Sequence, residues 1–177
     1  ILAASGCNLS DNLENVRIKE KILATDDVDL ATAYNSIAET YQYLRDYPKA
    51  VEYGLKSLVI KEKVLSLEHP YLAISYNNIA NTYKFLGDYQ KSLEYGLKDL
   101  AICKKILNPE HPDLANSYNN ITGAYEKLGD YTTALEYGLK GIAIREKVLS
   151  PEHPDLANSY NNIASTYYYL RSYTKAL

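Results

Sequence analysis

The chain has 177 residues, of which 46% are hydrophobic and 23% are charged, and its formal net charge is −3. This length allows one sizeable core or a short array of smaller units, and the weakly acidic balance offers no basic surface for nucleic acid. No stretch approaches the roughly eighteen apolar residues that a membrane span requires. We therefore expect no nucleic acid partner and no membrane span.

The first seven residues, "ILAASGC", look in outline like the end of a bacterial lipoprotein signal, in which Cys7 would carry the lipid. The charged and long apolar parts of such a signal are missing, so we treat residues 1–7 as an N-terminal remnant and predict a cytoplasmic protein. A lipid anchor at Cys7 is the alternative. Cys7 and Cys103 are far apart without metal-like spacing, which predicts neither a disulfide framework nor a zinc site.

Residues 8–24 are predicted to form a helix that caps the N-terminal end of the molecule. The apolar residues of this segment include Leu9, Leu13, Val16, Ile18 and Leu23. In register with the rest of the chain, this segment corresponds to the end of a second helix of a repeated unit.

The remainder of the chain repeats itself every 42 residues. The letters "HPDLANSYNNI" occur at 111–121 and again at 153–163, and "HPYLAISYNNI" occurs at 69–79. Tyrosines follow the same period in four series that include Tyr34, Tyr41, Tyr47 and Tyr53. Self-similarity of this kind is typical of a solenoid, in which each unit packs only against its neighbours. We predict units at about 27–68, 69–110, 111–152 and 153–177, with the last one truncated.

Each unit is predicted to contain two helices, A and B. In the third unit Leu114, Tyr118, Ile121, Tyr125 and Leu128 form one helical stripe, and Asp113 sits where an N-cap or first-turn acid belongs. "LGDY" supplies a glycine stop, and a second apolar stripe follows it. The A helices are predicted near 29–44, 71–86, 113–128 and 155–170, and the B helices near 47–65, 89–107 and 131–149.

The His-Pro pairs at His69, His111 and His153 fall in the connections between units, so we interpret these histidines as structural turn residues. One histidine per connection is a poor arrangement for a metal. The sequence also has no glycine-rich phosphate loop, nucleophile elbow or His-Glu zinc helix. We predict no catalytic residues, no metal and no cofactor.

Several residues of the repeat carry a family resemblance. Tyr118, Ile121, Tyr125, "GDY" and Ala134, at their spacing, resemble the tetratricopeptide repeat (TPR), although the period is 42 rather than 34. With "IREKVLSPEHPDLANSYNNIA" (144–164), the chain is similar to the TPR domain of kinesin light chains and their bacterial relatives. The resemblance extends from about Asn8 onward. It implies an all-α, right-handed solenoid and a non-enzymatic scaffold for protein partners.

One departure from the family lies in the B helices, at Gly54, Gly96 and Gly138, where the family usually has a large side chain. Each glycine costs roughly 1 kcal/mol of helix propensity relative to Ala. Close approach of a neighbouring helix is the expected compensation, and a hinge is the alternative.

The resemblance implies that the A helices line a concave groove for an extended peptide. The second, third and fourth units each carry an Asn pair in mid-helix although Asn is a mediocre helix former, and an amide matches the donors and acceptors of a peptide backbone. By resemblance, the backbone contact falls on Asn78, Asn120 and Asn162, with Ser36 a departure. The alternative is that the amides bond neighbouring helices and keep them in register. The full candidate set on this surface is Asn35, Asn77, Asn78, Asn81, Lys84, Asn116, Asn119, Asn120, Lys127, Asn158, Asn161 and Asn162, with four aromatics, Tyr43, Phe85, Tyr168 and Tyr169.

These four aromatics lie outside the tyrosine series, so they are predicted either to anchor ligand side chains or to pack at the ends of the A helices. Thr32, Ile74, Asn116 and Asn158 occupy the places where a carboxylate clamp would need cations, which argues against capture of a chain terminus.

The predicted function is therefore binding of an extended partner segment in this groove. A structural or self-assembling array, with association through the open C-terminal end, is one alternative. A regulatory or sensor part of a larger signalling protein is another.

Overall fold

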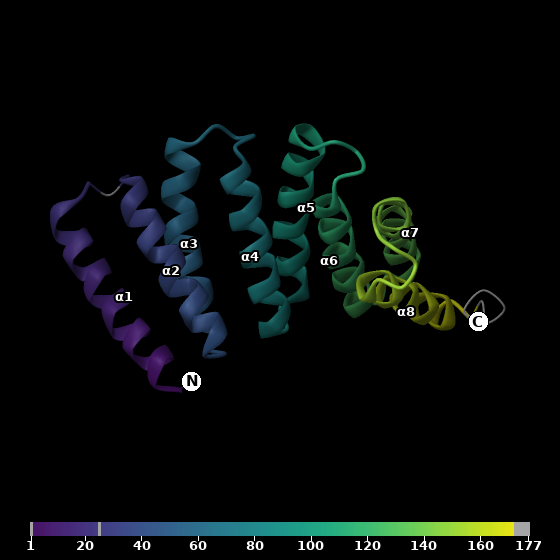
Figure 1. The fold of residues 1–177 in the computed structure, drawn as a ribbon, viewed down its shortest axis with the longest axis horizontal. Helices are drawn as coiled ribbons and strands as arrows, with labels where there is room; N and C mark the ends of the chain where they lie inside the picture. Colours follow the sequence, from purple (N-terminus) through teal and green to yellow (C-terminus); the bar gives the residue numbers. More distant parts are fainter. Residues whose placement is uncertain (1, 25, 172–177) are drawn as a thin grey trace.

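A computed structural model describes residues 2–24 and 26–171, apart from the side chains of residues 2–8, and this part of the chain consists of eight helices joined by short turns (Figure 1). The helices stand side by side in chain order and form a right-handed solenoid. The A helices are α2 (Val28–Tyr43), α4 (Pro70–Leu86), α6 (Pro112–Leu128) and α8 (Pro154–Tyr169), and the B helices are α3 (Tyr47–Val64), α5 (Tyr89–Ile106) and α7 (Tyr131–Val148). The first helix, α1, spans Leu2–Ile22 and begins six residues before the predicted start of the cap.

The termini of the helices follow from short local signals. His69, His111 and His153 are the N-caps of α4, α6 and α8, and each uses its ring Nδ1 to accept the backbone N–H two residues later. A proline occupies the first helical position, where a missing N–H costs nothing. The histidines are confirmed as structural residues, and Asp113 is a first-turn acid rather than the cap.

The A helices end at residues with left-handed backbone conformation. Gly87 (φ 86°) and Gly129 (φ 83°) adopt it easily because glycine has no Cβ. At the corresponding places in the first and fourth units Arg45 (φ 60°) and Arg171 (φ 58°) adopt it at some steric cost.

Most of the packing is between helices that follow one another in the chain. Helix contacts run α1 with α2, α2 with α3, and so on to α7 with α8, and in addition α4 touches α6 and α6 touches α8. The periodic tyrosines build the seams: Tyr95 of α5 stacks on Tyr83 and tilts against Tyr76, and Tyr53 and Tyr137 repeat the arrangement. The stripe predicted for the third unit is correct for Leu114 and Ile121, which are buried, and wrong for Leu128, which is exposed at the helix end.

The glycines of the B helices lie where neighbouring helices approach. Gly54 and Gly96 are buried, and a Cβ built on each would lie 3.4 Å from Cγ1 of an isoleucine, Ile79 or Ile121, in the next A helix. The next A helix is thus close to both glycines, as expected, and it leaves room for a methyl group but little for a larger side chain.

Candidate functional site

The candidate residues lie on the surface formed by α2, α4, α6 and α8, which we call the A wall. Asn77, Asn78 and Asn120 are partly buried there, whereas Asn116 and Asn158 are exposed. Two clefts between adjacent A helices, α2/α4 and α6/α8, each have a volume of about 10 Å³, enough for about one water molecule. A ligand would therefore lie on the A wall rather than inside these two clefts.

Amide side chains link neighbouring A helices along the wall. The Nδ2 of Asn120 donates to Oδ1 of Asn77 (3.2 Å), and the Nδ2 of Asn162 donates to Oδ1 of Asn119 (3.0 Å). Asn77 also accepts a bond from Asn81 of its own helix (2.8 Å). The register-keeping role that the sequence left open is thus present in the structure. Each donating amide still has its carbonyl oxygen and one N–H for other partners.

The first junction of the wall is built differently. Asn35 donates to Glu39 of its own helix (2.7 Å), and no bond to the Asn78 side chain exists among the described residues. Instead, Gln42 of α2 bonds the Asn78 backbone oxygen (3.3 Å) and the Thr82 hydroxyl of α4. Glu126 makes the equivalent contact with Thr166 of α8 (2.5 Å). Lys84 stands at the equivalent place between them, and Lys127 is exposed beside Glu126.

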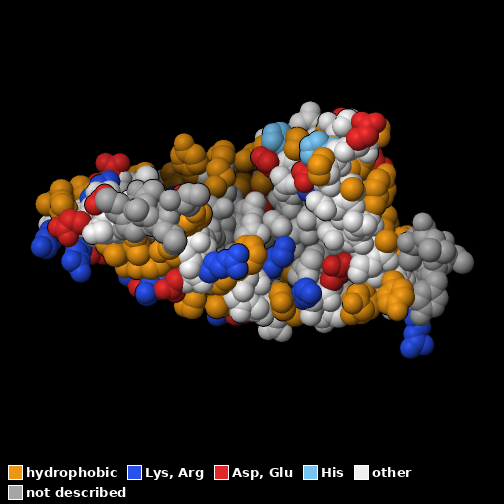
Figure 2. Space-filling model, turned by 60° about the horizontal axis from the view of Figure 1, so that its bottom comes forward, with side chains coloured by type: hydrophobic (Ala, Val, Ile, Leu, Met, Phe, Trp, Pro, Cys, Tyr) orange, Lys and Arg blue, Asp and Glu red, His pale blue; other side chains and the backbone are white. Residues whose placement is uncertain are grey.

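The four non-periodic aromatics lie near the C-terminal ends of the A helices and do not converge on one pocket. Phe85 stacks on Tyr47 (ring centroids 5.3 Å apart) and Tyr169 stacks on Tyr131 (4.7 Å), so both pack against the start of a B helix. All four nevertheless remain more than half exposed, at 67% for Tyr43, 63% for Phe85, 60% for Tyr168 and 55% for Tyr169. Figure 2 brings this edge forward and shows hydrophobic side chains and Lys or Arg side chains interspersed along it.

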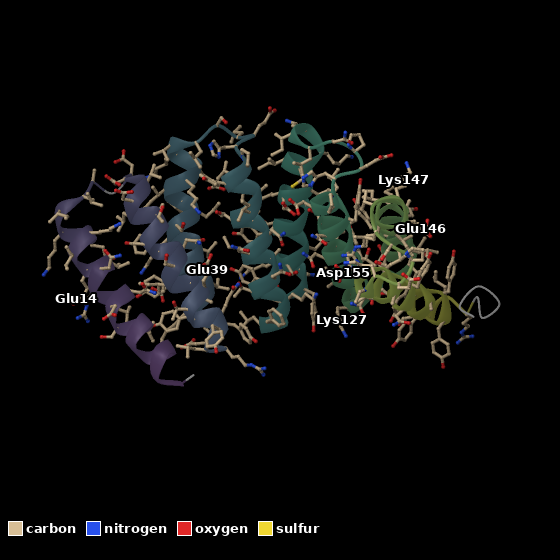
Figure 3. All side chains as sticks on the ribbon, viewed as in Figure 1. Glu14, Glu39, Lys127, Glu146, Lys147 and Asp155 are labelled. Atoms are coloured by element: carbon tan, nitrogen blue, oxygen red, sulfur yellow. The ribbon has the colours of Figure 1, made fainter. Side chains whose placement is uncertain are left out.

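Sequence reasoning missed a cation that reaches the wall from a B helix. The Arg145 side chain of α7 is 7% exposed and extends between α6 and α8, near Asp155, which is labelled in Figure 3. Its guanidinium donates to Oγ of Ser159 (2.6 Å), to Oδ1 of Asn116 (2.9 Å) and to the backbone oxygen of Asp155 (3.0 Å). Position 116 itself carries no cation, but the Arg145 guanidinium hydrogen-bonds the side chain at that position from a neighbouring helix.

Lys61 is the counterpart of Arg145 in the first unit. Its Nζ donates to Oγ of Ser75 (2.8 Å), and burial lowers the pKa of this lysine. Neither Lys61 nor Arg145 forms a salt bridge with a carboxylate in the described part of the chain. The signal in the sequence was the 42-residue series 61, 103 and 145, which contains two cations.

The middle member of that series is Cys103, which lies beside the acidic side chain of Asp99. Oδ1 of the buried Asp99 accepts from the Cys103 thiol (3.2 Å), and Oδ2 accepts from the Ser117 hydroxyl (2.6 Å). Burial raises the pKa of Asp99, and burial together with the Asp99 charge raises the pKa of the Cys103 thiol to about 12. Cys103 is therefore a packed thiol rather than a reactive one.

Two further observations concern the described residues only. No group of three His, Cys, Asp or Glu side chains comes together there in a way that could hold a metal ion. None of the helices in residues 2–24 and 26–171 is both long and apolar enough to cross a membrane.

Comparison with known proteins places these features in a family. The tetratricopeptide repeat model matches residues 29–98, 86–147 and 123–177, and the chain belongs to this family. No curated protein matches. Among solved structures, nearly identical TPR-like repeats of a Podosopora anserina protein described as a kinesin light chain align with a TM-score of 0.83 at 27% identity, covering 95% of this chain and 80% of that one.

More distant structures share the fold. BtubC (BKLC) from P. vanneervenii aligns with a TM-score of 0.82 at 23% identity, over 94% of this chain and 66% of that one. A signal transduction ATPase with a TPR sensor from Pyrococcus horikoshii gives 0.71 at 22%, over 93% of this chain and 24% of that one. The neighbour at 27% identity is the one described as a kinesin light chain, and the TPR fold is typically a non-catalytic scaffold for protein–protein interaction.

Proposed function

We propose that the A wall binds an extended segment of a partner protein, with amides on its backbone and Arg145 on one of its carboxylates. A peptide rises about 3.3 Å per residue and packed helices lie about 10 Å apart, so every third residue meets a new A helix. The spare carbonyl oxygens and N–H groups of Asn120 and Asn162 suit such a backbone. Asn78, which makes no side-chain bond among the described residues, suits it best.

The observation that carries the proposal is the state of Arg145. The Arg145 residue is only 7% exposed, so its side chain loses much of its hydration, and the three acceptors of its guanidinium are all neutral oxygens. A carboxylate of a bound segment would supply the missing counter-charge in a site where charge-assisted bonds are strong. We therefore expect the partner segment to be acidic at the residue that lies between α6 and α8.

The test begins with a random library of twelve-residue peptides selected against the wild-type chain. Arg145→Met should weaken the selected peptides about tenfold or more, because a hydrogen bond to a charged group contributes about 1.5–3 kcal/mol. Lys147→Met on the same helix is the matched control, since Lys147 is exposed and already paired with Glu110 at 2.8 Å. Asn120→Ala should also weaken binding. Selected peptides without an Asp or Glu preference, or equal affinity for all variants, would place the site elsewhere.

Self-association through the C-terminal end and a place in a larger signalling protein stay predictions. Light scattering over a range of protein concentrations tests the first of them.

A further inference from the structure

A second concave site lies between α1 and the B helix α3, and side chains of α2 form its floor. Its volume is about 570 Å³, within the range of about 300–1,000 Å³ typical of small-molecule sites. The walls and floor are mostly apolar and comprise Leu23, Leu30, Tyr34, Leu55, Val59 and Ile60. The equivalent groove one unit further along has a volume of only about 210 Å³.

An ion pair bridges this position in later units but not in the first. Lys105 pairs with Glu68 at 2.9 Å beside the smaller groove, and Lys147 pairs with Glu110 at 2.8 Å one unit further on. The 42-residue register makes Lys63 the counterpart of these lysines and Asp26 the counterpart of the two glutamates. Asp26 is one methylene shorter, and the described residues include no ion pair between it and Lys63.

The other charged groups at the rim of the first groove already have partners. Glu20 accepts a hydrogen bond from the Tyr34 hydroxyl (2.7 Å), and Lys56 pairs with Glu52 (2.8 Å) while its Nζ lies over the ring of Tyr53. Lys63 is exposed and is the one charged lining residue of this groove without such a partner in the part of the chain that the structure describes. The groove thus combines an apolar interior with a single available positive charge.

We propose that this groove binds a free single-chain anionic amphiphile, such as a medium-chain fatty carboxylate. Its hydrocarbon chain lies along Leu23, Leu55 and Val59, and its carboxylate pairs with Lys63. A site of this volume suits a small ligand rather than a second protein copy, because a stable interface buries about 1,200–2,000 Å². The proposal is independent of the A wall, because the groove and the A wall are lined by different side chains, including on α2, the helix that they share.

The experiment is a calorimetric titration of the whole chain with dodecanoate below its micelle-forming concentration. Lys63→Gln should weaken binding about threefold to fivefold, as for loss of one exposed ion pair. Val59→Glu should weaken it further, because Val59 is 52% exposed in the groove and the new carboxylate repels the ligand. Lys105→Gln and Ala101→Glu are the matched controls at the next groove and should leave dodecanoate affinity unchanged.

Three results would overturn the proposal. One is equal loss of affinity for Val59→Glu and Ala101→Glu, and another is binding of dodecyltrimethylammonium as tightly as dodecanoate. The third is flotation of the protein with phosphatidylglycerol-containing vesicles or ligand-independent dimerisation that Val59→Glu abolishes, because either would identify a different occupant. Circular dichroism melts of all four variants verify that each one is folded.

Discussion

The side-chain amide of Asn120 donates to Asn77 across the gap between α6 and α4, whereas Asn78, its equivalent one unit earlier, makes no side-chain bond in the described structure. Two residues at the same repeat position therefore differ in one interaction. The pair separates the contribution of the amide to helix register from its contribution to ligand binding.

Asn78→Ala should raise the free energy of unfolding by up to about 0.7 kcal/mol, because Ala is the better helix former. Asn120→Ala gains the same propensity but loses a hydrogen bond of about 0.5–1.5 kcal/mol, so its net change should be near zero or slightly destabilising. Urea unfolding of the two variants measures the difference. A greater loss for Asn78→Ala than for Asn120→Ala would contradict the hydrogen bonds described above.

Gly96 is the position at which a single methyl group and a larger side chain should have opposite effects. A Cβ there lies 3.4 Å from Cγ1 of Ile121, an ordinary contact, so Gly96→Ala should gain up to about 1 kcal/mol of helix propensity. Gly96→Leu should cost about 1–3 kcal/mol through overpacking against α6. Gly123→Ala, whose Cβ would meet nothing within 4 Å, is the control for propensity alone. A stable Gly96→Leu variant would show that α5 can move away from α6.

Asp99 should make stability depend on pH. Burial raises the pKa of this carboxyl, with a smaller contribution from the charge of Asp113, against the opposing hydrogen bonds from Ser117 and Cys103. A group whose pKa is raised on folding contributes stability that is complete below its ordinary pKa of 3.8 and is lost as the pH rises through the raised value. Asp99→Asn keeps an acceptor for Ser117 and removes the charge.

Asp99→Asn should therefore be more stable than the wild type at pH 7, and the gain should shrink toward pH 4. Thermal melts of both proteins at a series of pH values measure this. Asp113→Asn is the comparison, since Asp113 is exposed and should show a much smaller effect. A gain for Asp99→Asn that does not change with pH would mean that folding does not shift the pKa of the wild-type carboxyl.

His111 should behave as a helix cap. His111→Ala removes the acceptor for the Asp113 backbone N–H (3.2 Å) and should cost about 0.5–2 kcal/mol, whereas His111→Asn replaces it with a favoured capping residue and should be close to neutral. Chemical denaturation distinguishes the two. Equal losses for Ala and Asn would indicate that the ring contributes by packing and not by capping.

The repeat architecture could be predicted from the sequence because every signal recurs three or four times. The predicted A and B helices agree with the structure to within about a residue, because residues such as Pro112 and Gly129 mark where a helix begins and ends. The spacing of the tyrosines indicates which face of each helix is buried. A wall of Asn residues was predicted for the same reason. The bond between Asn120 and Asn77 could not be, because it depends on a distance between helices that spacing alone does not give.

Arg145 was missed for a physical reason as well. Its Cα belongs to a B helix, and only the length of its side chain brings the guanidinium to Asn116 on the other layer. The position of a residue on a helix face predicts where its Cβ lies, but not where the charged group at the end of a long side chain lies. The aromatic residues illustrate the same limit, since Phe85 and Tyr169 were on the expected surface but their stacking partners on α3 and α7 were not foreseeable.

Because most helix contacts are between chain neighbours, the apolar interior is divided into separate clusters, and within the described residues the cluster at the α7/α8 junction has three buried members, Ile142, Leu156 and Ile163. Opening that junction breaks few contacts and leaves the larger cluster around Leu72 and Ile121 intact. Amide hydrogen exchange should therefore be graded along the chain, fastest in α8 and slowest in α4 to α6. Local unfolding would therefore begin at α8. A ligand that bridges α6 and α8 would slow amide hydrogen exchange most in α8.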